Sequence, residues 1–194
     1  MNRQEICRKA HENAVEHGFW EKRNSNEHCI MLVITEIAEM VNADRKDRHA
    51  DTADYRNGLA CGERVARDCR PDTDIYRSTR PARVFENTIK DTVEDEMADT
   101  YIRLADLAES LGLDFTRMKP IPYCRAYDRF SFSENAFALV KGISKEWVAV
   151  EKRLQWAMDY VEKWAESAGI DLGFHVAEKM KYNASRPLRH GKAY

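Results

Sequence analysis

Two segments of this 194-residue chain each place a pair of carboxylates three residues apart within an apolar pattern. Glu36 and Glu39 lie in "VITEIAEM", residues 33–40, and Glu96 and Asp99 lie in "VEDEMADTYIRL", residues 93–104. Residues i and i+3 are neighbours on an α-helix, so each pair can bind one ion together. Carboxylate oxygens suit Mg²⁺, Mn²⁺ or Ca²⁺, whereas Zn²⁺ usually takes His or Cys ligands. The two pairs therefore predict a divalent-cation site between two packed helices.

Other interpretations of these carboxylates remain open. The chain is 33% charged, so acidic pairs with this spacing also arise on solvated helix faces. A di-iron bundle is disfavoured because it requires Glu-x-x-His, and neither Glu36 nor Glu96 has a His three residues later. Both pairs lie beside an apolar stripe, where carboxylates brought together repel and lose hydration unless a cation joins them. Glu94 and Asp95 fall outside the row of Glu96, and we expect both to face solvent.

The apolar periodicity predicts an all-α protein. We expect helices over residues 3–17, 26–46, 85–111 and 145–167, one helix after Ser133, and a short last helix near 172–183. Ser133 and Ser144 are candidate N-caps because a Ser hydroxyl can accept a hydrogen bond from the first helical turn.

Two segments interrupt the core of this pattern. Residues 47–84 alternate Arg with Asp and contain few apolar residues, which predicts a polar loop insertion whose Arg side chains are mostly solvated. Residues 115–170 form a second, helical insertion. The remaining segments, about 3–46, 85–112 and 172–183, are the expected core helices of a single all-α domain over residues 1–194, a helical bundle.

Composition restricts the possible partners and surroundings of the chain. The net charge of −2 comes from 31 basic and 33 acidic residues, so we expect neither a nucleic acid polymer nor a membrane as partner. The chain lacks both an apolar run long enough to cross a bilayer and an N-terminal apolar signal segment, which predicts a cytoplasmic protein. The five Cys form no C-x-x-C pair and are expected to be reduced.

The order of four segments resembles the MazG-like all-α nucleoside triphosphate pyrophosphohydrolases. These segments are "HENAVEHGFWE", "ITEIAEMVNADRK", "IKDTVEDEMADTYIRLADLA" and "EKMKYNASRPLRHGKAY", roughly half of the chain. The resemblance implies that Glu36, Glu39, Glu96 and Asp99 are the catalytic metal ligands, with Mg²⁺ as the working ion and Mn²⁺ as a possible substitute. It also implies hydrolysis of a nucleoside or deoxynucleoside triphosphate to the monophosphate and pyrophosphate, by a homodimer or higher homo-oligomer.

The same resemblance points to substrate-binding residues in the C-terminal segment. Lys179 and Arg186 are implied for phosphates and Asn183 for a sugar or base contact, with Tyr182 beside them. The cations of this segment can also form an ordinary basic tail. They are Lys179, Lys181, Arg186, Arg189 and Lys192.

Base recognition is open on sequence grounds. Trp20 and Phe19 can stack on a nucleobase, or they can plug the core after a helix end. Arg103 can bridge to Asp99 or Asp106 and orient a ligand, or it can simply neutralise its helix face.

The chain departs from the compact pattern of the family, because 56 residues, positions 40–95, separate Glu39 from Glu96. This departure weakens any transfer of substrate preference. Two alternatives to an enzyme therefore remain: a catalytically inactive nucleotide-binding or helical interaction protein, and a purely structural bundle.

Overall fold

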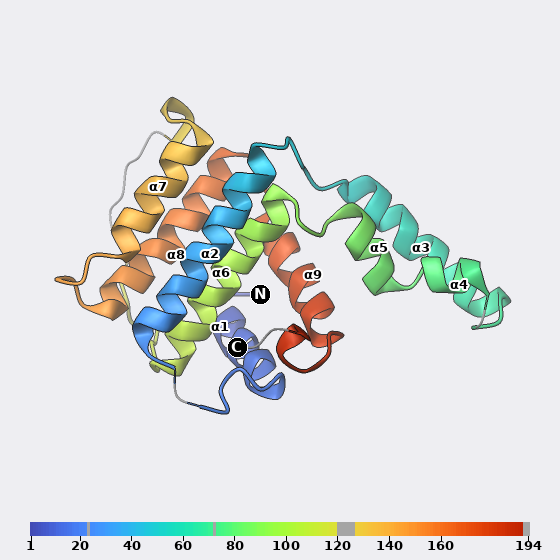
Figure 1. Cartoon of the computed structure of the whole chain (residues 1–194), viewed down its shortest axis with the longest axis horizontal. Coiled ribbons are helices and arrows are strands. Elements are labelled where there is room, and N and C mark those ends of the chain that lie inside the picture. The colour runs from blue at the N-terminus through green and yellow to red at the C-terminus, as the bar shows by residue number, and fades with distance from the viewer. Residues whose placement is uncertain (23, 72, 120–126, 192–194) are drawn as a thin grey trace.

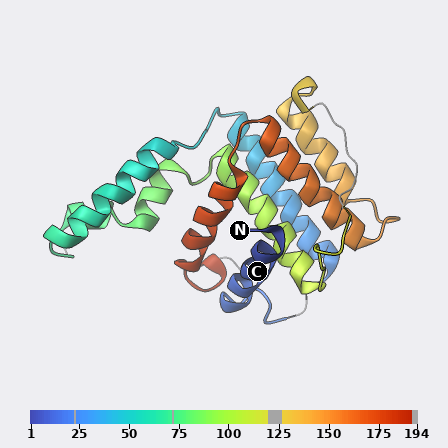
Figure 2. The same cartoon turned by 180° about the vertical axis from the view of Figure 1, so that it is seen from behind.

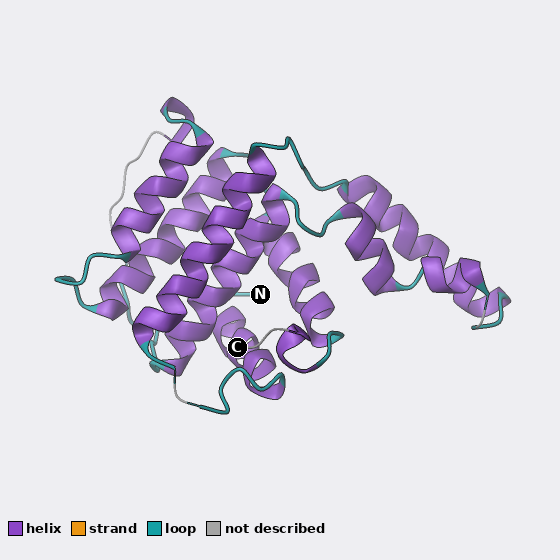
Figure 3. Cartoon of the chain, in the orientation of Figure 1, coloured by secondary structure: helices purple, strands orange, loops and turns teal. Residues whose placement is uncertain are grey.

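The computed structural model describes residues 1–22, 24–71, 73–119 and 127–191, and all regular secondary structure in these ranges is helical (Figure 1, Figure 3). The α-helices are α1 Arg3–Glu16, α2 Asn26–Asp44, α3 Thr52–Asp68, α4 Asp74–Ser78, α5 Pro81–Thr88, α6 Val93–Ser110, α7 Phe132–Ile143, α8 Val150–Ser167 and α9 Leu172–Ala184. Two short 3-10 helices are η1 Tyr127–Arg129 and η2 Leu188–Gly191. The all-α prediction is confirmed. Among the helices described, none combines the length and apolar character needed to span a membrane.

Helix α6 lies at the centre of a bundle and packs against α1, α2, α8 and α9 (Figure 1). Apolar residues recur on several of its sides, and Met97, Leu104 and Ala108 are completely buried. Helix α7 packs against α2 and α8, so the predicted second insertion shares one continuous core with the first two helices. The bundle therefore holds α2 and α6, the two carboxylate-bearing helices, side by side.

The prediction of one helix over residues 85–111 is wrong, because α5 ends at Thr88 and α6 begins at Val93. Asp91 has a φ of 60° in the connection, and the Thr92 hydroxyl caps α6 by accepting a hydrogen bond from the Asp95 amide. The apolar period continues in phase across this break, which explains why periodicity alone did not reveal it.

The prediction of a polar loop over residues 47–84 is also wrong, since this segment forms α3, α4 and the first turn of α5. The helices project from the bundle as an arm, residues 52–88, in both views (Figure 1, Figure 2). Only a narrow stripe of α3 is apolar, with Tyr55 and Val65 buried, while its other faces carry charges. A helix with so few apolar residues has the amino-acid composition of a polar loop, which explains the wrong prediction.

Neither of the two predicted N-caps, Ser133 and Ser144, is an N-cap in the structure. Ser131, and not Ser133, is the N-cap of α7, and it forms a capping box with Glu134. Ser144 is the C-cap of α7, and α8 begins after Ala149. The capping box explains the choice, because Glu134 stands three residues after Ser131 and satisfies its backbone amide.

Two glycines allow α3 to pack closely on the rest of the arm. A Cβ atom added at Gly58 would lie 2.6 Å from Val84 Cγ1, and one added at Gly62 would lie 2.4 Å from the backbone oxygen of Thr79. These separations are too short for real atoms, and a backbone oxygen cannot rotate aside. The close packing of α3 in the arm therefore requires glycine at positions 58 and 62.

We predict that Gly62→Ala destabilises the arm locally by about 1–3 kcal/mol, because overpacking forces α3 away from Thr79. Hydrogen exchange of the α3 and α5 amides should become faster, while α6 amides keep their protection. Gly173→Ala is the matched control, since its Cβ would meet its nearest neighbour, Asp171 Oδ1, at an ordinary 3.6 Å. Unchanged exchange in the arm of Gly62→Ala would contradict the proposed packing.

Candidate functional site

Three of the four predicted metal ligands come together between α2 and α6. One carboxylate oxygen from each of Glu36, Glu39 and Glu96 lies within 4.8 Å of the other two. Glu36 is 4% exposed and Glu96 is 5% exposed, whereas Glu39 is open to solvent. The group thus has two buried members and one member that solvent or a ligand can reach.

Asp99, the fourth predicted ligand, pairs with a lysine from α9. Lys179 Nζ lies 2.8 Å from Asp99 Oδ2 and 2.7 Å from Asp95 Oδ2. Lys179 and Asp95 are both buried, at 4% and 1% exposure. Lys179, implied by the resemblance for phosphates, therefore points into the bundle toward the α6 carboxylates.

The expectation that Glu94 and Asp95 face solvent is wrong. Asp95 is buried because α9 packs over this side of α6 and supplies Lys179 as a counter-ion. Glu94 is half-buried, because its carboxylate accepts hydrogen bonds from the Ala50 amide at 2.9 Å and from His49 at 3.0 Å. Lys179, Ala50 and His49 all come from outside α6, so the sequence around Glu94 and Asp95 does not reveal these partners.

Charge is poorly compensated at Glu96. Its Oε2 atom is buried and has no hydrogen-bond partner within the described chain. Burial, and next the charge of Asp99, raise the pKa of Glu96 to about 9. Burial acts to lower the pKa of Lys179, but the Asp99 and Asp95 carboxylates outweigh it and hold that pKa above its usual range. Lys179 thus pairs with Asp95 and Asp99. In the other half of the acidic region Arg103 pairs with Glu36, and no cation of the described residues pairs with Glu96.

The residues at this half fit a hard divalent cation. Glu36, Glu39 and Glu96 offer only oxygen donors, and Mg²⁺ and Mn²⁺ prefer oxygen ligands. The orphaned Oε2 atom of Glu96 would gain a partner if a cation were bound. A second possible group, Asp91, Asp95 and Glu96, fits less well because Lys90 and Lys179 already pair with two of its members.

A small cavity of about 50 Å³ adjoins the carboxylates. Its lining includes Glu36, Asp99, Arg103, Asn183 and Arg186. Arg103 Nε donates to Glu36 Oε1 at 3.1 Å, because Glu36 faces it from α2. This partner is neither Asp99 nor Asp106, the two bridging partners that the sequence left open. Asn183 is buried, and its Oδ1 atom has no hydrogen-bond partner among the described residues. Asn183 and Arg186 are thus brought to the predicted site.

A second cavity of about 200 Å³ shares Phe19, Arg103 and Asp106 with the first. Trp20 lines it, and its indole Nε1 donates to Asp106 Oδ1 at 2.9 Å. His11 Nδ1 lies 2.7 Å from the same oxygen. The sequence analysis did not single out His11. If α1 and α6 are assumed to pack together, the imidazole of His11 and the carboxylate of Asp106 become candidates for a contact.

The other predicted C-terminal residues point elsewhere. The Tyr182 ring stacks on Phe85 of the arm, with centroids 4.5 Å apart, and its hydroxyl donates to Glu86 at 3.2 Å. Lys181 pairs with Glu178, and Arg189 pairs with Glu21. Lys192 lies outside the described residues.

Cys7, Cys29, Cys61 and Cys69 are free thiols, as expected for the described part of the chain, and Cys124 lies outside it.

Comparison of the chain with protein-family models, with curated proteins and with solved structures finds no match. The MazG-like resemblance therefore stays a prediction that rests on the four segments.

We predict that Glu96→Gln flattens the pH dependence of stability in metal-free protein. The folded-state pKa of about 9 exceeds the ordinary value of 4.5, so ionisation of Glu96 removes stability as pH rises between these values. Glutamine cannot ionise, so the variant should lose less free energy of unfolding than wild type between about pH 5 and pH 8. Denaturant titration in a chelator measures this.

Glu16→Gln, at an exposed position of α1, is the control and should follow the wild-type curve. Parallel curves for Glu96→Gln and wild type would show that Glu96 titrates normally.

Proposed function

We propose that this chain is a Mg²⁺-dependent hydrolase that converts a nucleoside or deoxynucleoside triphosphate to the monophosphate and pyrophosphate. The observation that carries the proposal is the convergence of Glu36, Glu39 and Glu96 from two packed helices, with two of the three carboxylates buried. Burying carboxylates together costs several kcal/mol per ion, and a bound cation offsets this cost. The homo-oligomeric state implied by the resemblance belongs to the same proposal.

Glu36, Glu39 and Glu96 would hold the metal ion, with Asp99 beside them on the next turn of α6. A bound Mg²⁺ supplies neutralisation of phosphate charge and a lower pKa for the attacking water. Glu39 is the exposed member and is placed to orient that water or accept its proton. The buried Glu36 is oriented by Arg103.

Arg103 and Arg186 line the cavity beside the carboxylates and are the cations placed to bind phosphate oxygens there. Lys179 is buried between Asp95 and Asp99, so we assign it to positioning Asp99, in place of the phosphate contact implied by the resemblance. The adjoining cavity of about 200 Å³, with Trp20 in its wall, is where a nucleobase would lie.

A catalytically inactive nucleotide-binding protein is the alternative. The observation that favours it is the Lys179–Asp99 ion pair, because it engages one of the four predicted ligands. Turnover decides between the two functions, since both predict nucleotide binding.

The decisive assay incubates the purified chain with a panel of NTPs and dNTPs plus Mg²⁺ and measures pyrophosphate. We expect release of pyrophosphate from at least one nucleotide and none in a chelator, because the carboxylates act through the metal ion. Failure to release pyrophosphate from any nucleotide, also with Mn²⁺, would favour the binding protein.

We predict that Glu39→Gln and Asp99→Asn each lower kcat by at least about 100-fold, since each removes a charge from the proposed site. Circular dichroism should show unchanged helicity, because Glu39 is exposed and Asp95 still neutralises Lys179 in Asp99→Asn. Glu16→Gln is the matched control and should keep full activity. Wild-type turnover in either site variant would remove that residue from the mechanism.

A further inference from the structure

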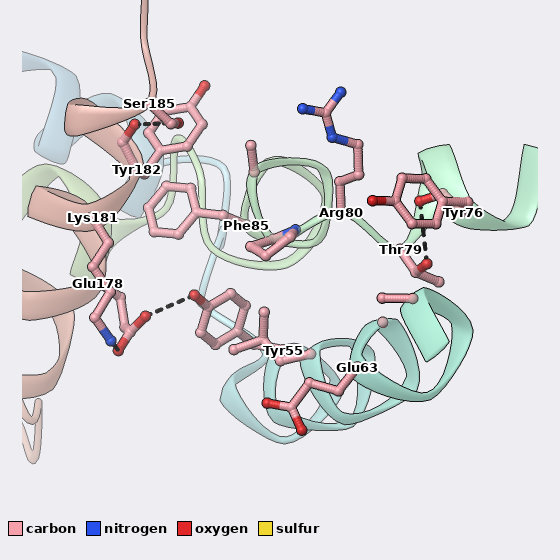
Figure 4. A pocket seen from close by; sticks show the side chains of 15 residues that line it. Tyr55, Glu63, Tyr76, Thr79, Arg80, Phe85, Glu178, Lys181, Tyr182 and Ser185 are labelled. Carbon is pink, nitrogen blue, oxygen red and sulfur yellow. Dashed lines mark hydrogen bonds and ion pairs between the residues drawn. The ribbon is translucent and has the colours of Figure 1, made fainter. Parts of the chain in front are cut away.

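A cavity of about 440 Å³ lies between the arm and α9 (Figure 4). Its lining contains none of the carboxylates of the proposed metal site. The volume falls in the range of small-molecule pockets, about 300–1,000 Å³. The proposed hydrolase chemistry makes no use of this space.

Aromatic residues form much of the cavity wall, and hydrogen bonds fix two of their rings. Tyr55 donates its hydroxyl hydrogen to Glu178 Oε2 at 2.8 Å, and Tyr182 donates to Glu86 Oε1 at 3.2 Å. Phe85 stacks on Tyr182 and meets the edge of Tyr55, with centroids 6.1 Å apart in the second contact. A flat apolar ligand would therefore meet a wall that is already ordered, so little side-chain entropy is lost on binding.

Arg80 is the unengaged cation of this wall. No hydrogen bond or ion pair joins its guanidinium to the described part of the chain, whereas Arg83 nearby pairs with Glu86 at 2.7 Å. Figure 4 shows Arg80 and the Glu63 carboxylate at opposite sides of the cavity. An anionic group would be attracted at the Arg80 side and repelled at the Glu63 side, which sets the direction of an elongated ligand.

We propose that this cavity binds a planar aromatic molecule bearing one anionic group, with its ring against the aromatic wall and its anion on Arg80. The ring gains by burial against Tyr55, Phe85 and Tyr182, and the anion gains a charge-assisted hydrogen bond. The site is separate from the carboxylates, so its ligand binds whether or not the chain hydrolyses nucleotides.

The test uses 8-anilinonaphthalene-1-sulfonate as the probe on the full chain, because its planar naphthalene ring carries one sulfonate and its fluorescence rises in apolar surroundings. Arg80→Gln should weaken its binding about tenfold, because the anion loses its charged partner. Ala66→Trp should weaken binding by a similar factor, since the new ring fills the cavity from an exposed position of α3 that tolerates substitution. Circular dichroism and denaturant titration report whether each variant folds.

Arg64→Gln is the control, because Arg64 is an exposed arginine of the same helix that does not line the cavity. We expect wild-type affinity in Arg64→Gln, and unchanged or tighter binding in Glu63→Gln, where the repelling carboxylate is removed. Equal probe affinity in wild type, Arg80→Gln and Ala66→Trp would overturn the proposal.

Competition distinguishes the anion that the cavity accepts. Displacement of the probe by a nucleoside monophosphate assigns the cavity to phosphates, and displacement by indole-3-acetate assigns it to aromatic carboxylates. Displacement by neither compound at millimolar concentration would also overturn the proposal.

Discussion

The buried contact of Lys179 with Asp95 and Asp99 is the interaction on which the placement of α9 depends. Removing either sign of charge from such a contact leaves an uncompensated buried ion, which is far more costly than losing an exposed pair. Helix α9 is therefore held on α6 in one register. That register brings Asn183 and Arg186 to the carboxylate cavity and turns Tyr182 toward the arm.

This contact also divides the acidic side of α6 into two electrostatic environments. Asp95 and Asp99 share the charge of Lys179, whereas Glu96 is buried beside Glu36 and Glu39 with a pKa raised by burial and by Asp99. A cation gains most where negative charge is buried and unmatched. Lys179 thus pairs with Asp95 and Asp99, and the metal ion that we propose would bind at Glu36, Glu39 and Glu96, where Glu96 Oε2 has no hydrogen-bond partner among the described residues.

Sequence reasoning succeeded where a feature depends on local geometry. The i, i+3 spacing of Glu36 and Glu39 follows from helical period alone, and so does the apolar stripe that buries α6. It failed where the deciding partner is distant: Asp95 is buried because of Lys179, 84 positions away. It also failed to predict that α3 is a helix. Part of the packing of α3 is a close backbone contact at Gly62, which leaves no apolar residue in the sequence as a signal.

Two consecutive residues of α9, Tyr182 and Asn183, face different parts of the molecule. Successive helical residues are rotated by about 100°, so Tyr182 and Asn183 cannot face the same space. Tyr182 belongs to the buried cluster of the arm, and Asn183 lies at the carboxylate cavity. Because Tyr182 of α9 is a member of this cluster, the apolar core of the arm includes a residue of the bundle. The arm, which is inserted between α2 and α6, therefore packs on α9, the same helix whose Lys179 pairs with Asp95 and Asp99 of α6.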